Sequence, residues 1–220
     1  MNVNIIDGRK SKKFSSAAKV LVDVYRSTST MPVMLRNNAR FIIPVGSVSE
    51  AKEIKKKNPD YILAGERYGF KVPGFDLSNS PYESSKMDFE NKIIIFTSTN
   101  GTKVLQKIKD SERIFIASFV NMKSTVEAIK KLGLQDIDII TSGRPDGEAD
   151  EDIFFAMAMK DSLTEGRDTA DSYIEKTREG KGTKRLSMIG GSNDAEVALS
   201  RDIVDFAVIY RDGKIEKYSS

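Results

Sequence analysis

The sequence contains neither cysteine nor histidine among its 220 residues. The absence of cysteine excludes disulfide bonds, thiolate metal sites and cysteine-based phosphatase chemistry. The absence of histidine excludes a Ser-His-Asp triad, a histidine-ligated zinc centre and a phosphohistidine intermediate. Any hydrolase built from this chain must therefore work with carboxylates, hydroxyls, arginine, lysine and backbone amides, and we expect it to use a hard metal ion.

Long apolar runs are absent too. No stretch approaches the roughly 20 apolar residues that a membrane-spanning helix needs, so we expect a cytoplasmic protein without a membrane partner. The 35 basic and 32 acidic side chains leave a formal charge of +3, which is too balanced to indicate nucleic acid as a partner. A small anionic ligand is compatible with this charge.

No strong repeat, low-complexity tract or linker divides the chain. We therefore predict a single domain over residues 1–220, in which two similar α/β halves could share one site. A homo-oligomer is compatible with the sequence.

Short apolar runs of strand length recur along the first two thirds of the chain. Several are nearly continuous, as expected of strands that are covered on both faces. They lie at residues 19–24, 40–45, 61–64, 92–96, 113–117 and 136–140. Stretches with helical features alternate with these runs. The alternation predicts a three-layer α/β/α sandwich around a largely parallel sheet.

Helix signals fall between the apolar runs. Ser47 and Glu50 have the spacing of a capping box and predict a helix over residues 47–57. Asn121 precedes a second helical stretch at residues 122–132. Further helices are expected after Ser29, with Pro32 in the first turn, after Gly101 and after Asp150; the polar residues 166–185 are predicted to form an exposed helix.

Near the end of the chain, Asp212 and Gly213 separate two short apolar runs at residues 206–210 and 214–218. An Asp-Gly pair between such runs is typical of a two-residue hairpin turn. The sequence therefore predicts an antiparallel hairpin at the edge of the sheet.

Residues 66–91 interrupt the alternation. Glycine and proline punctuate this segment, and its aromatic residues favour an ordered structure. Loops of this length inside compact domains are usually functional or disordered. We predict that residues 69–81 form one wall of a pocket, with Asp76 or Asn79 turned toward its ligand.

Polar and charged side chains follow four of the predicted strands at their carboxyl ends, where open α/β sheets bind ligands. Carboxylates suit a hard cation, guanidinium groups suit a dianion, and the free amides of a helix N-terminus also favour an anion. The candidates are Asp23 with Arg26, Glu66 with Arg67, the turn Thr99-Asn100-Gly101-Thr102, and Arg144 with Asp152. Together they indicate phosphoryl-transfer chemistry.

Each of these motifs also has an ordinary structural explanation. A Ser/Thr-rich turn commonly caps a helix, an Asn-Gly pair marks a turn, and acidic residues in a first helical turn complement the helix dipole. The arginines could form surface ion pairs. The recurrence of the motifs at strand ends is what favours a functional site.

Six segments appear in an order that resembles the ComB family of 2-phosphosulfolactate phosphatases. They are residues 22–30, 64–69, 74–81, 97–102 and 117–121, and Gly143-Arg144 followed by Glu151-Asp152. The resemblance implies a Mg²⁺-dependent phosphomonoesterase that makes sulfolactate on a route to coenzyme M. Tyr25, Ser78 and Ser98 depart from the family pattern and leave the charged residues intact. They therefore leave the substrate more open than the reaction class.

The resemblance leads to one hypothesis for the site. Asp23, Glu66 and Asp152 hold Mg²⁺, directly or through water, while Arg26, Arg67, Arg144 and the turn from Thr99 to Thr102 hold the phosphate and the acidic groups of the substrate. Asp23, Arg26 and Arg144 are the catalytic candidates.

The nucleophile is left open between Asp23 and a metal-activated water. Tyr25 stands where haloacid-dehalogenase-like phosphatases carry a second aspartate, which favours the water. The alternative to an enzyme is a non-catalytic binding protein for an acidic metabolite. Such a protein would need the arginines but not the metal-binding carboxylates.

Overall fold

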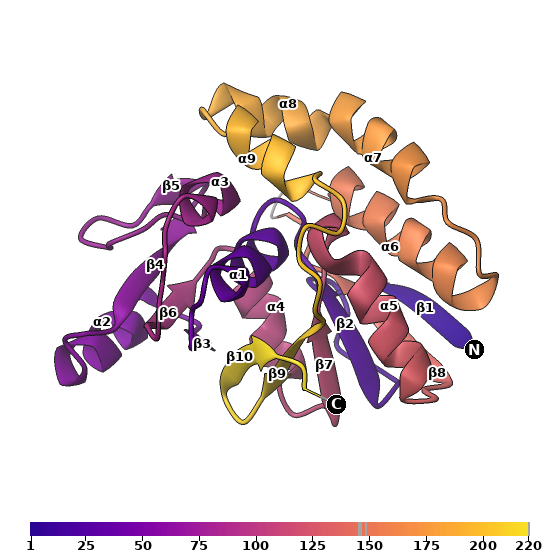
Figure 1. Cartoon of the computed structure of the whole chain (residues 1–220), viewed down its shortest axis with the longest axis horizontal. Coiled ribbons are helices and arrows are strands. Elements are labelled where there is room, and N and C mark those ends of the chain that lie inside the picture. Colours follow the sequence, from indigo (N-terminus) through magenta and orange to yellow (C-terminus); the bar gives the residue numbers. More distant parts are fainter. Residues whose placement is uncertain (145–146, 148, 220) are drawn as a thin grey trace.

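The computed structural model describes residues 1–144, 147 and 149–219. Within these residues, ten strands form a sheet with helices on both faces (Figure 1). In spatial order the strands are β1 (Asn2–Asp7), β8 (Asp136–Thr141), β2 (Ala18–Val22), β7 (Arg113–Ile116), β9 (Val208–Arg211), β10 (Lys214–Lys217), β3 (Phe41–Pro44), β6 (Ile93–Thr97), β4 (Ile62–Arg67) and β5 (Phe70–Lys71). All six predicted strands are present; β1 and the short β5 were not predicted.

The sheet consists of two parallel sets joined by a hairpin. β1, β8, β2 and β7 are parallel to one another, and so are β3, β6 and β4. The predicted hairpin β9–β10 lies between the two sets and pairs antiparallel with β7 and β3. The prediction of an edge position was wrong, because each strand of the hairpin pairs with a further strand, and its residues Val208 and Ile215 are buried in the core.

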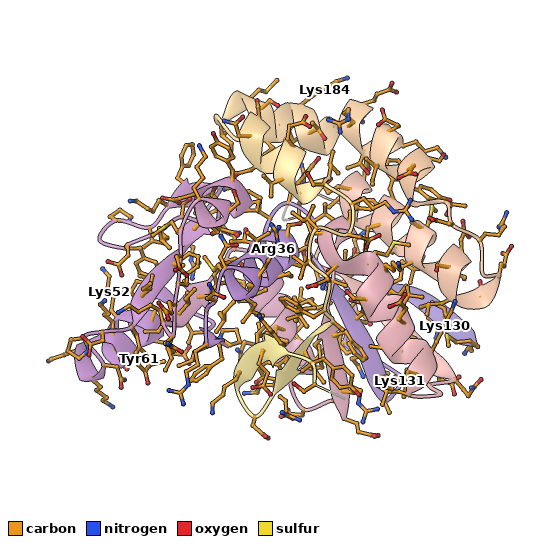
Figure 2. The ribbon with its side chains drawn as sticks, viewed as in Figure 1. Arg36, Lys52, Tyr61, Lys130, Lys131 and Lys184 are labelled. Carbon is orange, nitrogen blue, oxygen red and sulfur yellow. The ribbon has the colours of Figure 1, made fainter. Side chains whose placement is uncertain are left out.

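Helices cover both faces of the sheet, which confirms the predicted sandwich. The helices are α1 (Ser27–Arg36), α2 (Val48–Lys57), α3 (Pro81–Ser85), α4 (Gly101–Ile108), α5 (Met122–Lys131), α6 (Asp150–Thr164), α7 (Ala170–Glu179), α8 (Lys181–Met188) and α9 (Ser192–Ala198), with a 3₁₀ turn at Phe119–Asn121. Charged side chains such as Lys52 on α2 and Lys130 on α5 project from their outer faces (Figure 2). No helix among the described residues is long and apolar enough to cross a membrane.

The continuous burial of β2 shows why its apolar run does not alternate. Val20 and Val22 belong to the core cluster that contains residues of α5 and α6. Leu21 points the other way, into the cluster that contains Val104 and Leu105 of α4. Successive residues of a strand face opposite sides of the sheet, so a strand between two helical layers must be apolar throughout.

The start of α2 shows the predicted capping interactions, whereas α1 starts at a different residue from the one predicted. The Ser47 hydroxyl accepts a hydrogen bond from the Glu50 amide at 3.1 Å, and a Glu50 carboxylate oxygen accepts one from the Gly46 amide at 3.1 Å. Helix α1 begins at Ser27, three residues before the predicted start after Ser29. Pro32 therefore lies inside the helix rather than in its first turn.

The stretch predicted as an exposed helix, residues 166–185, differs most from its prediction. Instead of one exposed helix it forms α7 and α8, which together with α9 lie across one end of the molecule (Figure 1). Ala170, Ile174 and Leu186 are buried beneath these helices. We call α7, α8 and α9 the helical cap.

Candidate active site

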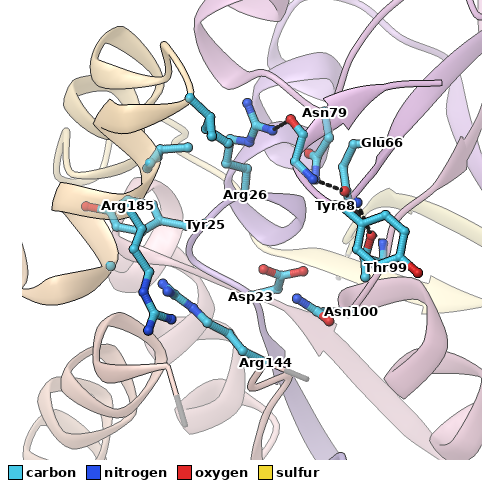
Figure 3. Close-up of a pocket in the computed structure, with 14 residues that line it drawn as sticks. Asp23, Tyr25, Arg26, Glu66, Tyr68, Asn79, Thr99, Asn100, Arg144 and Arg185 are labelled. Carbon is cyan, nitrogen blue, oxygen red and sulfur yellow. Dashed lines mark hydrogen bonds between the residues drawn. The ribbon is translucent and has the colours of Figure 1, made fainter. Parts of the chain in front are cut away.

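A cavity of about 260 Å³ lies between the carboxyl ends of the strands and the helical cap (Figure 3). The strand ends contribute Asp23 after β2, Glu66 in β4, Thr99 and Asn100 after β6, and Arg144 after β8. Helix α8 contributes Gly182, Arg185, Leu186 and Ile189, the last at its end. Arg26, Tyr25, Gly69 and Asn79 also line the cavity, so both parallel sets supply it.

Asp23 is the central carboxylate of this cavity. Its Oδ2 atom accepts hydrogen bonds from the Ser27 hydroxyl at 2.7 Å and from the Gly101 amide at 2.9 Å. A Cβ atom at position 101 would lie 2.6 Å from Oδ2, so this close approach requires glycine. Within the described residues, no hydrogen bond reaches Oδ1. The first amide of α4 therefore holds Asp23, and one carboxylate oxygen is left for a ligand.

The pKa of the Asp23 carboxyl group differs from the ordinary value of an aspartate. The residue is only 4% exposed, and this burial raises the pKa of its carboxyl group from 3.8 to about 6. The negative charges of Glu66 and Glu151 raise the pKa further, while the bonds from Ser27 and Gly101 lower it. The cavity is thus a buried place with excess negative charge that a cation would stabilise.

Glu66 joins two turns at the edge of the cavity. Its carboxylate accepts hydrogen bonds from the Thr99 amide at 2.5 Å, the Thr99 hydroxyl at 2.9 Å and the Gly69 amide at 2.7 Å. The Thr99 hydroxyl in turn accepts from the Tyr68 amide at 2.9 Å. Glu66 therefore fixes the β6–α4 turn against the β4–β5 turn and lines the cavity at the same time.

Asp152 lies in the first turn of α6, outside the set of residues that line the cavity. Its Oδ1 accepts from the Val24 amide at 2.8 Å, and its Oδ2 accepts from the Ser142 hydroxyl and the Gly143 amide, each at 3.2 Å. Burial and the neighbouring charges of Asp23 and Glu151 raise the pKa of Asp152. In this position Asp152 ties the ends of β2 and β8 together.

The three predicted arginines are placed differently. Arg26 lines the cavity, pairs with Asp194 at 2.5 Å and donates to the Gly69 carbonyl at 2.6 Å. Arg144 lines the cavity and pairs with Glu151. Arg67 lies outside the cavity lining and donates to the Glu66 carbonyl at 2.6 Å and the Thr97 hydroxyl at 2.8 Å.

The segment predicted to form a wall contributes Gly69 and Asn79 to the cavity. Asn79 donates weakly to the Ser27 hydroxyl at 3.3 Å, and its buried Oδ1 has no partner among the described residues. Asp76 lies outside the cavity lining, half exposed, where it accepts from the Leu63 amide at 2.8 Å and pairs with Lys55 at 3.5 Å.

The residues of the turn after β6 have two different roles. Thr99 and Asn100 line the cavity, whereas Thr102 does not. The Thr102 hydroxyl donates to the Ser98 carbonyl and accepts from the Ser98 amide, both at 3.0 Å. Thr102 thus closes the turn that presents the other two residues.

Sequence reasoning missed Arg9, Asp194 and Arg185. Arg9 donates to Asn100 Oδ1 at 2.9 Å and so orients a cavity residue from the segment after β1. Asp194 reaches Arg26 from α9, accepts from the Ser80 hydroxyl and accepts from the Tyr82 amide at 3.3 Å. Each lies in a polar stretch of the sequence without a motif spacing that would mark it as a site residue.

The oxygen donors of this cavity fit a magnesium ion that is bound by only a few protein ligands. Asp23 Oδ1 and the unpaired Asn79 Oδ1 are hard oxygen donors in the same cavity. Within the described residues, no three carboxylates lie close enough together to hold a metal ion. Mg²⁺ typically binds one or two carboxylates and keeps waters or substrate phosphate as its other ligands. The residues therefore fit Mg²⁺, but not as a cage of three carboxylates.

Asp194 gives a test of how the cap supports the site. We expect Asp194→Ala to reduce the free energy of unfolding by about 3 kcal/mol, because removing one partner of a buried ion pair leaves the other charge unpaired. The side chain of Arg26 is 8% exposed, and that of Asp194 is 7% exposed. Urea denaturation measures the loss.

Asp171→Ala is the matched control. Asp171 pairs with Arg201 at 3.0 Å, but its side chain is 82% exposed. A surface pair of this kind contributes no more than about 1 kcal/mol. Equal losses in the two variants would show that the Arg26–Asp194 pair does not stabilise the site.

The sandwich and its cavity, lined by carboxylates and arginines at strand ends, define an α/β protein with a site suited to a phosphorylated anion. Residues 4–213 match the family model described as 2-phosphosulpholactate phosphatase. The chain therefore belongs to this family of phosphoric monoester hydrolases. This match confirms the resemblance to the ComB family found in the sequence.

Curated relatives support the same membership over almost the whole chain. A protein of Thermoplasma acidophilum is 42% identical over 215 residues, covering 97% of this chain and 94% of the relative. One of Thermoplasma volcanium is 40% identical over 213 residues, covering 97% and 98%. One of Clostridium acetobutylicum is 32% identical over 237 residues, covering 98% and 100%. Each is named a probable 2-phosphosulfolactate phosphatase.

Proposed function

We propose that this chain is a Mg²⁺-dependent phosphomonoesterase that hydrolyses 2-phosphosulfolactate, or a closely related phosphorylated hydroxy acid, to sulfolactate and phosphate. The observation that carries the proposal is the placement of Asp23 among Arg26, Arg144 and Asn100 in one cavity. The family membership and the names of the relatives support the substrate.

Asp23 would hold the magnesium ion through Oδ1, with Asn79 Oδ1 as a second donor and Glu66 acting through water. When bound, the ion would neutralise phosphate charge and help to activate a water. The protein positions the groups that would contact the ion and the substrate. Ser27 and the Gly101 amide fix the Asp23 carboxylate, and Arg9 orients Asn100. Asp152 acts as a positioning residue that holds the ends of β2 and β8.

The arginines would bind the anionic substrate. Guanidinium groups match the oxygens of phosphate and carboxylate in a planar, two-pronged geometry. Asp194 and the Gly69 carbonyl fix the orientation of Arg26, and Glu151 pairs with Arg144. The helical cap covers the opposite side of the cavity and would limit the access of water there, which would strengthen these contacts in the transition state.

Phosphate release from a panel of phosphomonoesters, assayed with Mg²⁺, tests the proposal. We expect kcat/KM to be highest for 2-phosphosulfolactate and about 10²-fold or more lower for isopropyl phosphate, which lacks both additional acid groups. No release from any member of the panel would refute the enzyme. Tight binding of 2-phosphosulfolactate without turnover would instead support a binding protein.

A further inference from the structure

The cavity has two chemically different ends. At the strand ends lie the carboxylates Asp23 and Glu66 with Thr99. On the opposite side of Asp23 in the view of Figure 3, the guanidinium groups of Arg144 and Arg185 extend toward the same part of the cavity. Arg144 follows β8, whereas Arg185 comes from the cap helix α8. The cap therefore adds positive charge at the end away from Glu66.

Helix α8 is held close to this end by a glycine. A Cβ atom at Gly182 would lie 2.2 Å from Glu151 Oε2 and 2.8 Å from Arg144 Nη2, so α8 rests directly on the Arg144–Glu151 pair. Residues three and four apart share one face of a helix. Arg185 and Leu186 follow Gly182 at these spacings and line the cavity.

The space at this end suits a small acid on a short carbon chain. Leu186 of α8 and Tyr25 add apolar surface to the cavity lining. A second hollow of about 230 Å³ shares Arg144, Gly182 and Arg185 with the first cavity, and is lined also by Gly147, Lys181, Asp150 and Glu151. There is thus room for an oxyanion beyond the place that the phosphate would take near Asp23.

Two guanidinium groups that extend toward one place can both bond a single planar oxyanion, and each has several donors, so this is compatible with the Arg144–Glu151 pair. The strand end of the cavity is unsuited to a second anion, since Asp23 and Glu66 would repel it unless a cation intervened. A second acid group is therefore directed toward α8.

We propose that the α8 end of the cavity is a subsite for one of the acid groups that the substrate carries besides its phosphate, and that Arg185 determines the preference for this group. The proposal rests on the proposed function and adds the element that selects the substrate. The specificity residue lies on the cap, whereas the residues that face the reacting phosphate lie on the sheet.

The test compares Arg185→Gln with Lys184→Gln. Both variants remove one positive charge from an exposed position of α8, but Lys184 projects away from the protein (Figure 2) and does not line the cavity. The kcat/KM values are measured for isopropyl phosphate, 2-phospholactate and 2-phosphosulfolactate, which carry no, one and two additional acid groups.

We expect Arg185→Gln to lower kcat/KM for 2-phosphosulfolactate by about 10- to 100-fold, mainly through KM, as for a lost charge-assisted hydrogen bond. Isopropyl phosphate should change by less than about threefold, and Arg185→Lys should restore part of the loss. The 2-phospholactate value shows whether the carboxylate or the sulfonate occupies the subsite. Lys184→Gln should leave all three values unchanged.

Equal losses for the three substrates, or no loss in Arg185→Gln, would overturn the subsite. Calorimetric titration with sulfolactate separates this outcome from failure of the proposed function, because product binding needs no turnover. If the unaltered chain releases no phosphate, the enzyme proposal fails, and the sulfolactate affinity alone decides on Arg185. Unchanged affinity in Arg185→Gln would then refute the subsite, and at least tenfold weaker binding would support it.

Discussion

Replacing Asp23 with asparagine is expected to abolish turnover and at the same time to stabilise the metal-free protein. The variant loses the charge that faces the phosphate site, and we expect kcat to fall by about 10³-fold or more. The fold should be retained because the asparagine Oδ1 can still accept from Ser27 and Gly101. Its amide would take the position of the oxygen that has no hydrogen-bond partner within the described residues.

The gain in stability follows from the raised pKa of Asp23. Folding raises this pKa from 3.8 to about 6, so the folded state holds the proton to a higher pH than the unfolded state does. The contribution of this group to stability is therefore present below pH 4 and is lost as the pH rises through about 6. Asparagine has no proton to lose. The variant should be more stable by about 1–3 kcal/mol at pH 7, and by almost nothing below pH 4.

Thermal unfolding of the metal-free protein at pH 7 and pH 4 measures this difference, which corresponds to a few degrees in Tm at the higher pH. Asp60→Asn, at an exposed carboxylate in the turn before β4, is the control and should change neither activity nor Tm. Full turnover in Asp23→Asn would place Asp23 in a purely structural role. A loss of stability at pH 7 would show that its ionised carboxylate supports the fold.

The sequence predicted the layers of the fold better than the order of its strands. Apolar runs between two helical layers are visible directly, as in β2, where Val20, Leu21 and Val22 are all buried. Pairing between distant segments leaves no such local trace. The Asp212-Gly213 turn revealed the hairpin but not that β7 and β3 would pack on either side of it. The separate helices of the cap were not predicted because their few buried residues lie in a polar sequence.

Prediction of the candidate site from the sequence was limited in a similar way. Residues directly after a strand could be identified, but not the direction of each side chain. Glu66 and Arg67 are consecutive in β4 and so point to opposite faces, which is why only Glu66 lines the cavity. Asp152 is likewise next to the carboxylate of Glu151, yet its oxygens turn to the backbone of Val24 and Gly143.

Removal of divalent metal is expected to eliminate phosphate release, with full recovery when Mg²⁺ is returned. Asp23 and Glu66 place negative charge where the phosphate dianion must come, and in a buried cavity this repulsion is strong unless a cation lies between them. The chain has neither histidine nor cysteine, so histidine- and thiolate-based catalysis is not available to replace the metal. The arginines alone would bind the substrate without overcoming this barrier.

The measurement is phosphate release after dialysis against excess chelator, followed by titration with Mg²⁺. The apparent affinity for Mg²⁺ should weaken as the pH falls below about 6, because the Asp23 carboxyl group, whose pKa is raised to about 6, must lose its proton to bind the ion. Asp23→Asn should not recover at any Mg²⁺ concentration, which separates loss of the ligand from general salt effects. Full activity in excess chelator would refute the metal requirement while leaving the family membership intact, since that rests on the match over residues 4–213.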